Sequence, residues 1–561
     1  MKCMKDILYK IFHPKESFYR YLSTFSEGCI KSKGKRFIII HIDGLSYFAL
    51  RRALKFRFMP FITKLLNSQT HKIARFDCGL PATTPAFMAG IMYGDNSNIP
   101  GFRWYDKERK EFIIMKSLND TGRLEQELSK NEGILTDGTS YCTLFTGGAK
   151  ESVFAVSKLY ELNRYIKINF VTAILLMVFN MGVVLRIVFS MVTELISELK
   201  EYIIQTVRKE VRRSEVPFIP IRLITNVLLR EISTILAEVD IYRGVSSIYI
   251  DYVGYDELAH HRGPLSLSSL ITLYSIDRDI KKLFKAIKKS GNQYEVYILS
   301  DHGQVPTLPF DRVGGQSFED YIIKEVIGTR IIYNKGNIEY LREQRQLSFL
   351  NYLQSIRQSM PRGFGYIADV LIERIKRRVK ESIPEVDVTD LNQIFLLPTS
   401  DLAHLYFNKF DRRLLENEIE YYYPNIKEII LAHGNIAAIT YLSEEGVIVE
   451  TPEGKALISE GNIKVLRGSV SSFFSLLYKG IESDIERLTK MKNSGDIIIF
   501  AGRFRGRVLN FQEELGGHGG PYPEEQSAFI IFPRDKKFNF YRIRNSTQLY
   551  NFFKKEYRFY A

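Results

Sequence analysis

Acidic and histidine side chains that can bind metal ions occur in four clusters of the 561-residue sequence. Asp256 and His260 stand four residues apart in DYVGYDELAHHRGP, so a helix beginning near Asp256 would place both on one face. The remaining members are Asp43 after FIIIHI, the adjacent Asp301 and His302 in LSDHG, and His518 in ELGGHGG. Carboxylate and imidazole groups suit zinc, with manganese as the alternative. A single residue of this kind is more often a cap or loop residue, but four clusters together favour a metal centre.

A threonine precedes a proline at the start of a predicted helix in GLPATTPAFMAGIMYG, residues 79–94. Because proline is favoured at the first helical position, we expect Thr84 to be the N-cap. Its hydroxyl would face free backbone N–H groups and the positive end of the helix dipole, where a phosphoryl group is stabilised. A metal ion touching the hydroxyl would make it a nucleophile. The plain alternative is a helix cap worth about 1 kcal/mol.

Apolar, β-branched runs supply the elements that would position these residues. They cover residues 37–42, 245–250, 294–299, 496–500 and 528–532, and they alternate with helical stretches such as 277–289. Near-continuous apolar runs of this length predict an α/β fold with a buried, mostly parallel sheet between helices. Ligands in such sheets bind beyond the carboxyl ends of the strands, and the Asp and His residues fall there.

The same pattern suggests how the chain is divided. We expect an N-terminal helical extension over 1–35 and a catalytic core in three parts, 36–160, 243–335 and 491–561. Two insertions would interrupt the core: an apolar helical one over 161–242 and a cap-like one over 336–490.

The order of the candidate residues resembles the alkaline phosphatase superfamily, and above all its nucleotide pyrophosphatase/phosphodiesterase (type I phosphodiesterase) branch. That branch has a catalytic threonine ten residues before a glycine, and Thr84 stands ten residues before Gly94, whereas Thr83 does not. It also has an Asp-x-x-x-His-x-x-Gly-Pro segment, which residues 256–264 match. Over 36–160, 217–335 and 490–535 the sequence further resembles a bacterial, membrane-linked subgroup.

The resemblance implies an alkaline-phosphatase-like core and two divalent metal ions, zinc by preference. One ion would be held by Asp256, His260 and His518, and the other by Asp43, Asp301 and His302, beside Thr84. It implies hydrolysis of phosphodiester or pyrophosphate bonds in two steps. Thr84 attacks phosphorus to form a phospho-threonine, which water then hydrolyses.

One segment departs from the pattern of the branch. Where the nucleotide pyrophosphatases carry an asparagine for the phosphate oxygen, this chain reads GFRWYD over residues 101–106. Arg103 could bind phosphate oxygens through two parallel hydrogen bonds, or it could only pair with a surface carboxylate. The missing asparagine weakens the expectation of a nucleotide substrate.

Other functions stay open. A phosphomonoesterase or a phospho-group transferase would use the same residues, while a sulfatase is disfavoured because no Cys/Ser-x-Pro-x-Arg segment is present. A non-catalytic, membrane-associated scaffold is the alternative from another class. All seven expected positions are filled, which argues against it.

Charge and hydropathy suggest where the protein works. Lys and Arg number 78 against 64 Asp and Glu, and no long basic tail is present, so phosphate-bearing ligands or an anionic membrane surface suit the chain better than specific nucleic-acid binding. Residues 170–192 are apolar and long enough to span a bilayer, but they contain Arg186 and separate residues of one site. If these residues form one site, a single crossing is excluded, and the segment must cross twice, lie in the membrane interface or pack on the protein. With the basic cluster at 208–213 and no secretory signal, we expect a membrane-associated protein on the cytoplasmic side, acting on a phosphate ester that could be lipid-linked.

Overall fold

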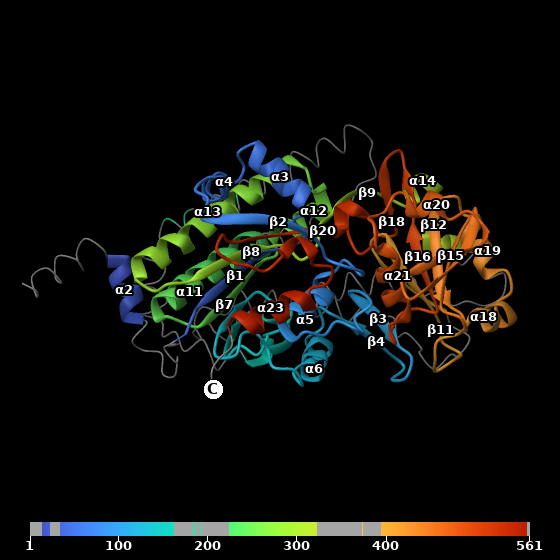
Figure 1. Ribbon diagram of the computed structural model, residues 1–561, viewed down its shortest axis with the longest axis horizontal. Helices are drawn as coiled ribbons and strands as arrows, with labels where there is room; N and C mark the ends of the chain where they lie inside the picture. Colours follow the sequence, from blue (N-terminus) through green and yellow to red (C-terminus); the bar gives the residue numbers. More distant parts are fainter. Residues whose placement is uncertain are drawn as a thin grey trace, which may run out of the picture.

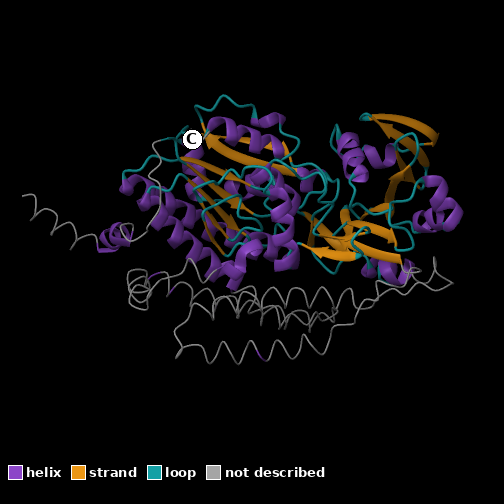
Figure 2. Cartoon of the chain, turned by 90° about the horizontal axis from the view of Figure 1, so that it is seen from below, coloured by secondary structure: helices purple, strands orange, loops and turns teal. Residues whose placement is uncertain are grey.

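The computed structural model describes residues 14–22, 34–161, 224–322 and 394–557, together with the single helical positions 182, 185, 192 and 373. Two sheet-based parts lie side by side, one with helices on both faces of its sheet and one richer in strands (Figures 1 and 2). The N-terminal and C-terminal thirds of the described chain both contribute to the first part.

The first sheet has seven strands in the order β2-β20-β8-β1-β7-β5-β6. Its strands are β1 (Phe37–Ile42), β2 (His71–Asp77), β5 (Thr139–Tyr141), β6 (Glu151–Val153), β7 (Ser247–Tyr252), β8 (Glu295–Leu299) and β20 (Ser527–Pro533). β1 pairs in parallel with β7 and β8, while β20 runs antiparallel between β8 and β2. The predicted α/β fold with a mostly parallel sheet is therefore confirmed.

Helices cover both faces of this sheet because successive residues of its central strands, which point to opposite faces, are apolar (Figure 1). Ile38 and Ile40 of β1 pack against one set of helices, and Phe37 and Ile39 pack against the other. The first set is α3 (Tyr47–Lys55), α4 (Pro60–Asn67), α11 (Arg230–Arg243) and α13 (Leu267–Ser290), and the second is α5 (Thr84–Tyr93), α6 (Leu118–Leu128) and α23 (Thr547–Glu556).

The second sheet also has seven strands, in the order β10-β11-β16-β12-β13-β14-β15, and all of its pairings are antiparallel. Its strands are β10 (Ile394–Thr399), β11 (Leu402–Phe407), β12 (Ile436–Leu442), β13 (Val447–Thr451), β14 (Gly454–Ser459), β15 (Asn462–Gly468) and β16 (Ile497–Ala501), flanked by α18 (Glu416–Tyr422), α19 (Ile426–Ala432), α20 (Ser471–Phe474) and α21 (Ile481–Lys490). The sequence suggested that the apolar run at 496–500 belongs to the first sheet. It lies instead in the second sheet, as β16. Every residue of β16 is buried, as expected for a central strand of either sheet. Hydropathy alone therefore could not show which sheet this strand joins.

Smaller elements join the two parts. β9 (Val305–Pro309) pairs with β18 (Arg507–Asn510) and with β19 (Gly516–Gly517), and β17 (Arg503–Phe504) extends this small sheet. β3 (Arg103–Asp106) and β4 (Glu111–Ile114) form a hairpin. The remaining elements are α2 (Pro14–Leu22), η1 (Val156–Glu161), η3 (Ile224–Leu229), α12 (Gly254–Arg262), α14 (Asp311–Gly314), α15 (Phe318–Tyr321), α22 (Pro523–Gln526) and η5 (Phe540–Arg542).

The expectation of a membrane-associated protein on the cytoplasmic side is wrong. Throughout the described ranges, no helix is both long enough and apolar enough to cross a bilayer. The apolar segment 170–192, apart from three single positions, and the basic cluster 208–213 lie outside the described residues.

Candidate metal centre and nucleophile

The site lies where the carboxyl ends of neighbouring strands meet. Asp43 directly follows β1, and Asp301 and His302 follow β8, which is hydrogen-bonded to β1. α12, which begins just after β7, carries Asp256 and His260. His518 follows β19, and the pairing of β19 with β9 brings it beside the segment that leaves β8. Seven residues predicted from sequence, counting Thr84, are thereby brought into one cluster.

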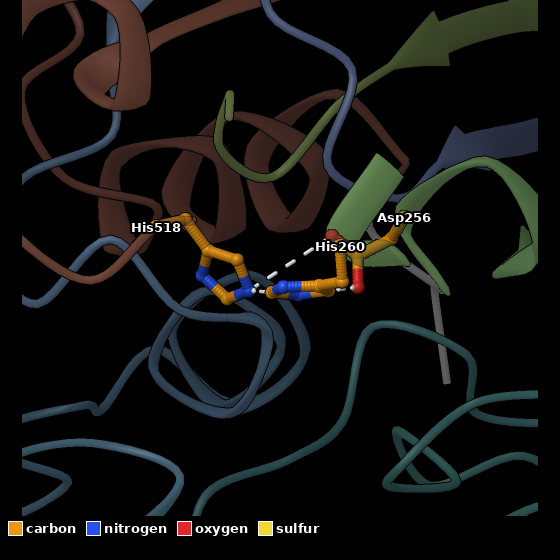
Figure 3. A group of neighbouring side chains, drawn as sticks. All are labelled: Asp256, His260 and His518. Carbon is orange, nitrogen blue, oxygen red and sulfur yellow. Dashed lines mark hydrogen bonds and ion pairs between the residues drawn. The ribbon is translucent and has the colours of Figure 1, made fainter. Parts of the chain in front are cut away.

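The first group consists of Asp256, His260 and His518, whose side chains point toward one another (Figure 3). Nε2 of His260 lies 3.3 Å from Oδ2 of Asp256 and 3.1 Å from Nε2 of His518. Nε2 of His518 lies 3.8 Å from Oδ1 of Asp256. The four-residue spacing predicted that Asp256 and His260 lie on one face of a helix, and in α12 they do.

The second group surrounds the Thr84 hydroxyl. Its Oγ1 lies 3.3 Å from Oδ1 of Asp43 and 3.3 Å from Nε2 of His302. The same Nε2 is 3.1 Å from Oδ2 of Asp301 and 3.8 Å from Oδ1 of Asp43. A carboxylate oxygen from each aspartate, an imidazole nitrogen and a hydroxyl therefore face one small region.

Thr84 differs in one respect from the prediction. The N-cap of α5 is Thr83, and Thr84 is the first helical residue. Its side chain turns to Asp43 and His302 and caps no backbone N–H. All ten residues of α5 are buried, and the helix ends at Gly94 with φ of 76°, so its start is held rigidly against the sheet.

Each of the three imidazoles of the site places its Nδ1 against a backbone carbonyl. His518 Nδ1 lies 2.8 Å from the Ala82 carbonyl, His260 Nδ1 lies 3.0 Å from the Gly516 carbonyl, and His302 Nδ1 lies 3.0 Å from the Gly303 carbonyl. A proton on each Nδ1 satisfies these carbonyls and leaves each Nε2 with a lone pair that faces the carboxylates. This is the tautomer that a metal-binding histidine needs.

Charge crowding perturbs the acids of the site. Burial, followed by the neighbouring charges of Asp301 and Asp256, raises the pKa of Asp43 well above its ordinary value. Burial also opposes ionisation of Asp256, but His260 and His518 outweigh it and lower the pKa of that carboxyl. Burial lowers the pKa of His518 to about 3, and the charge on His302 acts in the same direction.

This arrangement fits divalent cations. The Nε2 lone pairs of His260 and His518 face each other at 3.1 Å, a contact that a cation between them and Asp256 would turn from repulsive to attractive. Oδ2 of Asp301 is fully buried yet accepts no hydrogen bond from the described residues. Ligand atoms of the first group lie within 4.8 Å of one another, as do those of Asp43, Asp256 and His302, and of His41, Asp43 and Asp301. Nitrogen and carboxylate donors of this kind suit zinc or manganese.

Four further residues support the site and were not predicted to belong to it. Gln304 Nε2 donates to the carbonyl and to Oδ1 of Asp256, and Glu514 Oε2 lies 3.1 Å from Nδ1 of His260. His41 lies between Asp251 and Asp301, with no exposed surface. Burial lowers the pKa of His41, but the two carboxylates outweigh it and raise that pKa. The one available signal was a lone imidazole inside the otherwise apolar run FIIIHI.

A pocket opens beside the first group, between the two parts of the molecule. Besides the site residues it is lined by Phe102, Arg103, Lys116, Thr399, Ser400 and Gln512. Arg103 is buried on β3, and its Nε donates to the Pro398 carbonyl of β10 at 3.0 Å. The guanidinium that sequence analysis singled out is thus anchored at the wall of this pocket.

Comparison with known proteins places these features in context. A sequence model of the family described as type I phosphodiesterase / nucleotide pyrophosphatase matches residues 37–393. No curated protein sequence matches the chain.

Solved structures that resemble the chain do so at low identity. Phosphonoacetate hydrolase from Sinorhizobium meliloti 1021 in complex with phosphonoformate is 11% identical, with a TM-score of 0.45 and coverage of 93% of this chain and 96% of the other. Murine ectonucleotide pyrophosphatase / phosphodiesterase 5, inactive and in complex with AMP, is 10% identical, with a TM-score of 0.43 and coverage of 94% and 96%.

Proposed function

Since the chain belongs to the type I phosphodiesterase / nucleotide pyrophosphatase family and is a phosphoric-ester hydrolase, we propose that it cleaves phosphodiester or pyrophosphate bonds with Thr84 as the nucleophile. Two divalent metal ions, zinc or manganese, would be bound by the two groups of ligands described above. The ion of the first group would be held by Asp256, His260 and His518, and that of the second by Asp43, Asp301 and His302.

The position of the Thr84 hydroxyl is the observation that best supports this proposal. The Thr84 hydroxyl is the only alcohol oxygen recorded at 3.3 Å from both a carboxylate and an imidazole of the cluster, within the described residues, and it stands at the start of a buried helix. A hydroxyl so placed can lose its proton toward Asp43 or His302 while the helix dipole stabilises negative charge on an incoming phosphoryl group.

The chain's own residues then account for the two steps. Oγ1 of Thr84 attacks phosphorus, the bond to the leaving oxygen breaks, and a phospho-threonine forms. Water attacks phosphorus from the opposite side, the bond to Oγ1 breaks, and Thr84 is regenerated with release of the phosphate product. Bound divalent cations supply charge neutralisation at the attacking and leaving oxygens. Arg103 and the polar wall of the pocket would hold the esterified group during both steps.

The first test removes the nucleophile. We expect Thr84→Ala to lower the hydrolysis of bis(p-nitrophenyl) phosphate by about 10³-fold or more, because the hydroxyl that faces Asp43 and His302 and would form the covalent intermediate is lost. Thr83→Ala is the matched control, since it removes the neighbouring buried hydroxyl, which makes no hydrogen bond with the described residues. Hydrolysis by Thr84→Ala at the rate of Thr83→Ala would refute the proposal. Turnover of p-nitrophenyl phosphate measured alongside distinguishes diester from monoester preference.

The second test removes the metals. We expect purified protein to contain, or to take up on titration, two equivalents of zinc or manganese, and chelation to abolish hydrolysis reversibly. Asp256→Asn should lower the bound metal by one equivalent, because the amide no longer offers a charged ligand to the ion of the first group. Uptake well below one equivalent by the unmodified chain would contradict metal dependence.

A further inference from the structure

His41 occupies an unusual position behind the site. It lies in β1, two residues before Asp43, and its ring is completely buried among strand residues that are otherwise isoleucine or phenylalanine. Nδ1 lies 3.3 Å from Oδ1 of Asp251 and 3.2 Å from the Tyr249 hydroxyl, while Nε2 lies 3.1 Å from Oδ1 of Asp301. Because an apolar residue here would leave the buried carboxylates of Asp251 and Asp301 without their contact to the imidazole, packing alone does not account for the histidine.

The two carboxylate oxygens of Asp301 have different neighbours. On the protein side, Oδ1 accepts a hydrogen bond from the Gly44 N–H at 3.1 Å and lies 3.1 Å from Nε2 of His41. Oδ2 is left facing Nε2 of His302 at 3.1 Å, in the region that the Thr84 hydroxyl also faces. A carboxylate held at one oxygen cannot rotate freely, so a single oxygen is presented to a cation.

The geometry also argues against His41 as a ligand in its own right. Its Nε2 lies near Asp43 and Asp301 and forms one of the candidate groups. Both ring nitrogens nevertheless face carboxylate oxygens, Asp251 on one side and Asp301 on the other. A cation bound at Nε2 would have to displace the contact of this nitrogen with Oδ1 of Asp301.

We propose that His41, braced by Asp251, is a positioning residue that fixes the orientation of Asp301 and thereby strengthens metal binding beside Thr84. This inference rests on the proposed function, because it assumes that Asp301 binds a metal ion. Asp251 acts only through the imidazole, since its contact is with Nδ1 and not with Asp301. Partners of metal ligands in such positions typically change affinity about 10- to 100-fold.

Two amide substitutions test the direction of the contact. The amide of His41→Asn reaches the position of Nδ1 but not that of Nε2, whereas the amide of His41→Gln reaches the position of Nε2. We expect His41→Asn to weaken one of two zinc equivalents about 10- to 100-fold, measured by competition with a chromogenic chelator on the full chain. His41→Gln should restore most of that affinity, and the other equivalent should be unchanged in both.

Asp251→Asn supplies the independent measurement. We expect it to weaken the same equivalent by a smaller factor, and to add less than about twofold in the His41→Asn background, because its effect passes through the ring. His404→Gln is the matched control, since His404 is equally buried and hydrogen-bonded to the Pro100 carbonyl and the Gly495 N–H, away from the site. It should leave both equivalents at their original affinities.

The outcomes separate the two proposals. Wild-type affinity at both equivalents in His41→Asn, or equal losses in His41→Asn and His41→Gln, would overturn the positioning role while leaving the proposed function intact. If the loss of affinity caused by Asp251→Asn added in full to the loss caused by His41→Asn, Asp251 would not act through the imidazole. If His41→Asn does not fold, Asp251→Asn alone decides, and unchanged affinity there counts against the inference. A wild-type chain that binds no metal would remove the proposed function as well.

Discussion

Gly44 illustrates how closely single residues are fitted to this site. It follows Asp43 with φ of 69°, and a Cβ at this position would lie 2.3 Å from Oδ1 of Asp256. The strand end can therefore approach the first group of candidate ligands only because no side chain intervenes. The Gly44 N–H also donates to Asp301, so one glycine touches an acid of each group.

We expect Gly44→Ala to displace Asp256 and to lower both the hydrolysis rate and zinc affinity by at least about tenfold, as loss of a metal-ligand contact does. Gly291→Ala is the control. Its φ of 78° imposes the same backbone cost of about 1 kcal/mol, but nothing lies within 4 Å of its Cβ. Equal losses of activity in the two variants would show that backbone strain, and not the contact with Asp256, is responsible.

The sequence was a better guide to the candidate ligands than to the residues that contact and orient them. Asp256 and His260 were recognisable because helical spacing and residue type agree. His41 was missed because one imidazole in FIIIHI looks like an exception in an apolar strand, and its partners Asp251 and Asp301 are distant in sequence. The assignment of Thr84, the six ligands and Arg103 to their roles stays a prediction until the experiments above are done.

At the scale of elements, local hydropathy predicted strands but not their neighbours. β1 has the bounds 37–42 that were expected, β8 begins one residue later than predicted, and β20 is one residue longer at each end. The run at 496–500 is a strand as predicted, yet it pairs with β11 and β12 of the second sheet. Pairing partners depend on long-range topology, which a single apolar run does not encode.

The placement of Thr84 shows the same limit at a helix end. Proline at position 85 correctly marked the start of α5, but the N-cap is one residue earlier than expected. Helix boundaries are uncertain by a residue because Thr83 and Thr84 are both acceptable caps. What decides is the tertiary contact of the Thr84 hydroxyl with Asp43 and His302.

At the scale of the whole molecule, a buried carboxyl pair connects the two parts. Asp401 lies between β10 and β11, and Glu525 lies in α22, which leads from the His518 loop into β20. Both oxygens of Asp401 and Oε1 of Glu525 accept no hydrogen bond from the rest of the described structure. Burial is the main cause that raises the pKa of Asp401 to about 7, and burial with Asp401 raises that of Glu525 well above its ordinary value. A proton retained on one of the two carboxyls would relieve the repulsion between them.

This pair should make stability depend on pH. The folded chain retains a proton that the unfolded chain, with carboxyl pKa values near 4, has released, so between about pH 4 and pH 7 the folded state binds more protons. The free energy of unfolding should therefore fall as pH rises through this window, by on the order of 1 kcal/mol per unit. Arg503, which lowers the pKa of Asp401, and Glu524, which raises that of Glu525, are the other charges facing the pair.

We expect Asp401→Asn to flatten this slope, because its amide can donate to Glu525 without a titrating proton. Chemical unfolding followed at pH 4.5, 5.5 and 6.5 measures the difference, with Glu453→Gln, an exposed carboxyl, as the control. A slope in Asp401→Asn as steep as in Glu453→Gln would show that the pair does not share a proton.

The order of the first sheet has a consequence for synthesis on the ribosome. β20 occupies the place between β2 and β8, and it pairs with β2 over seven residues from His71 to Asp77. More than 400 residues separate the two strands in sequence, so a nascent chain exposes β2 as an unpaired edge until β20 has been translated. His518 emerges in the same late interval. Neither the sheet nor the ligand set can be completed before residues 516–533 have emerged, and the nascent chain must be protected from edge-to-edge association until then.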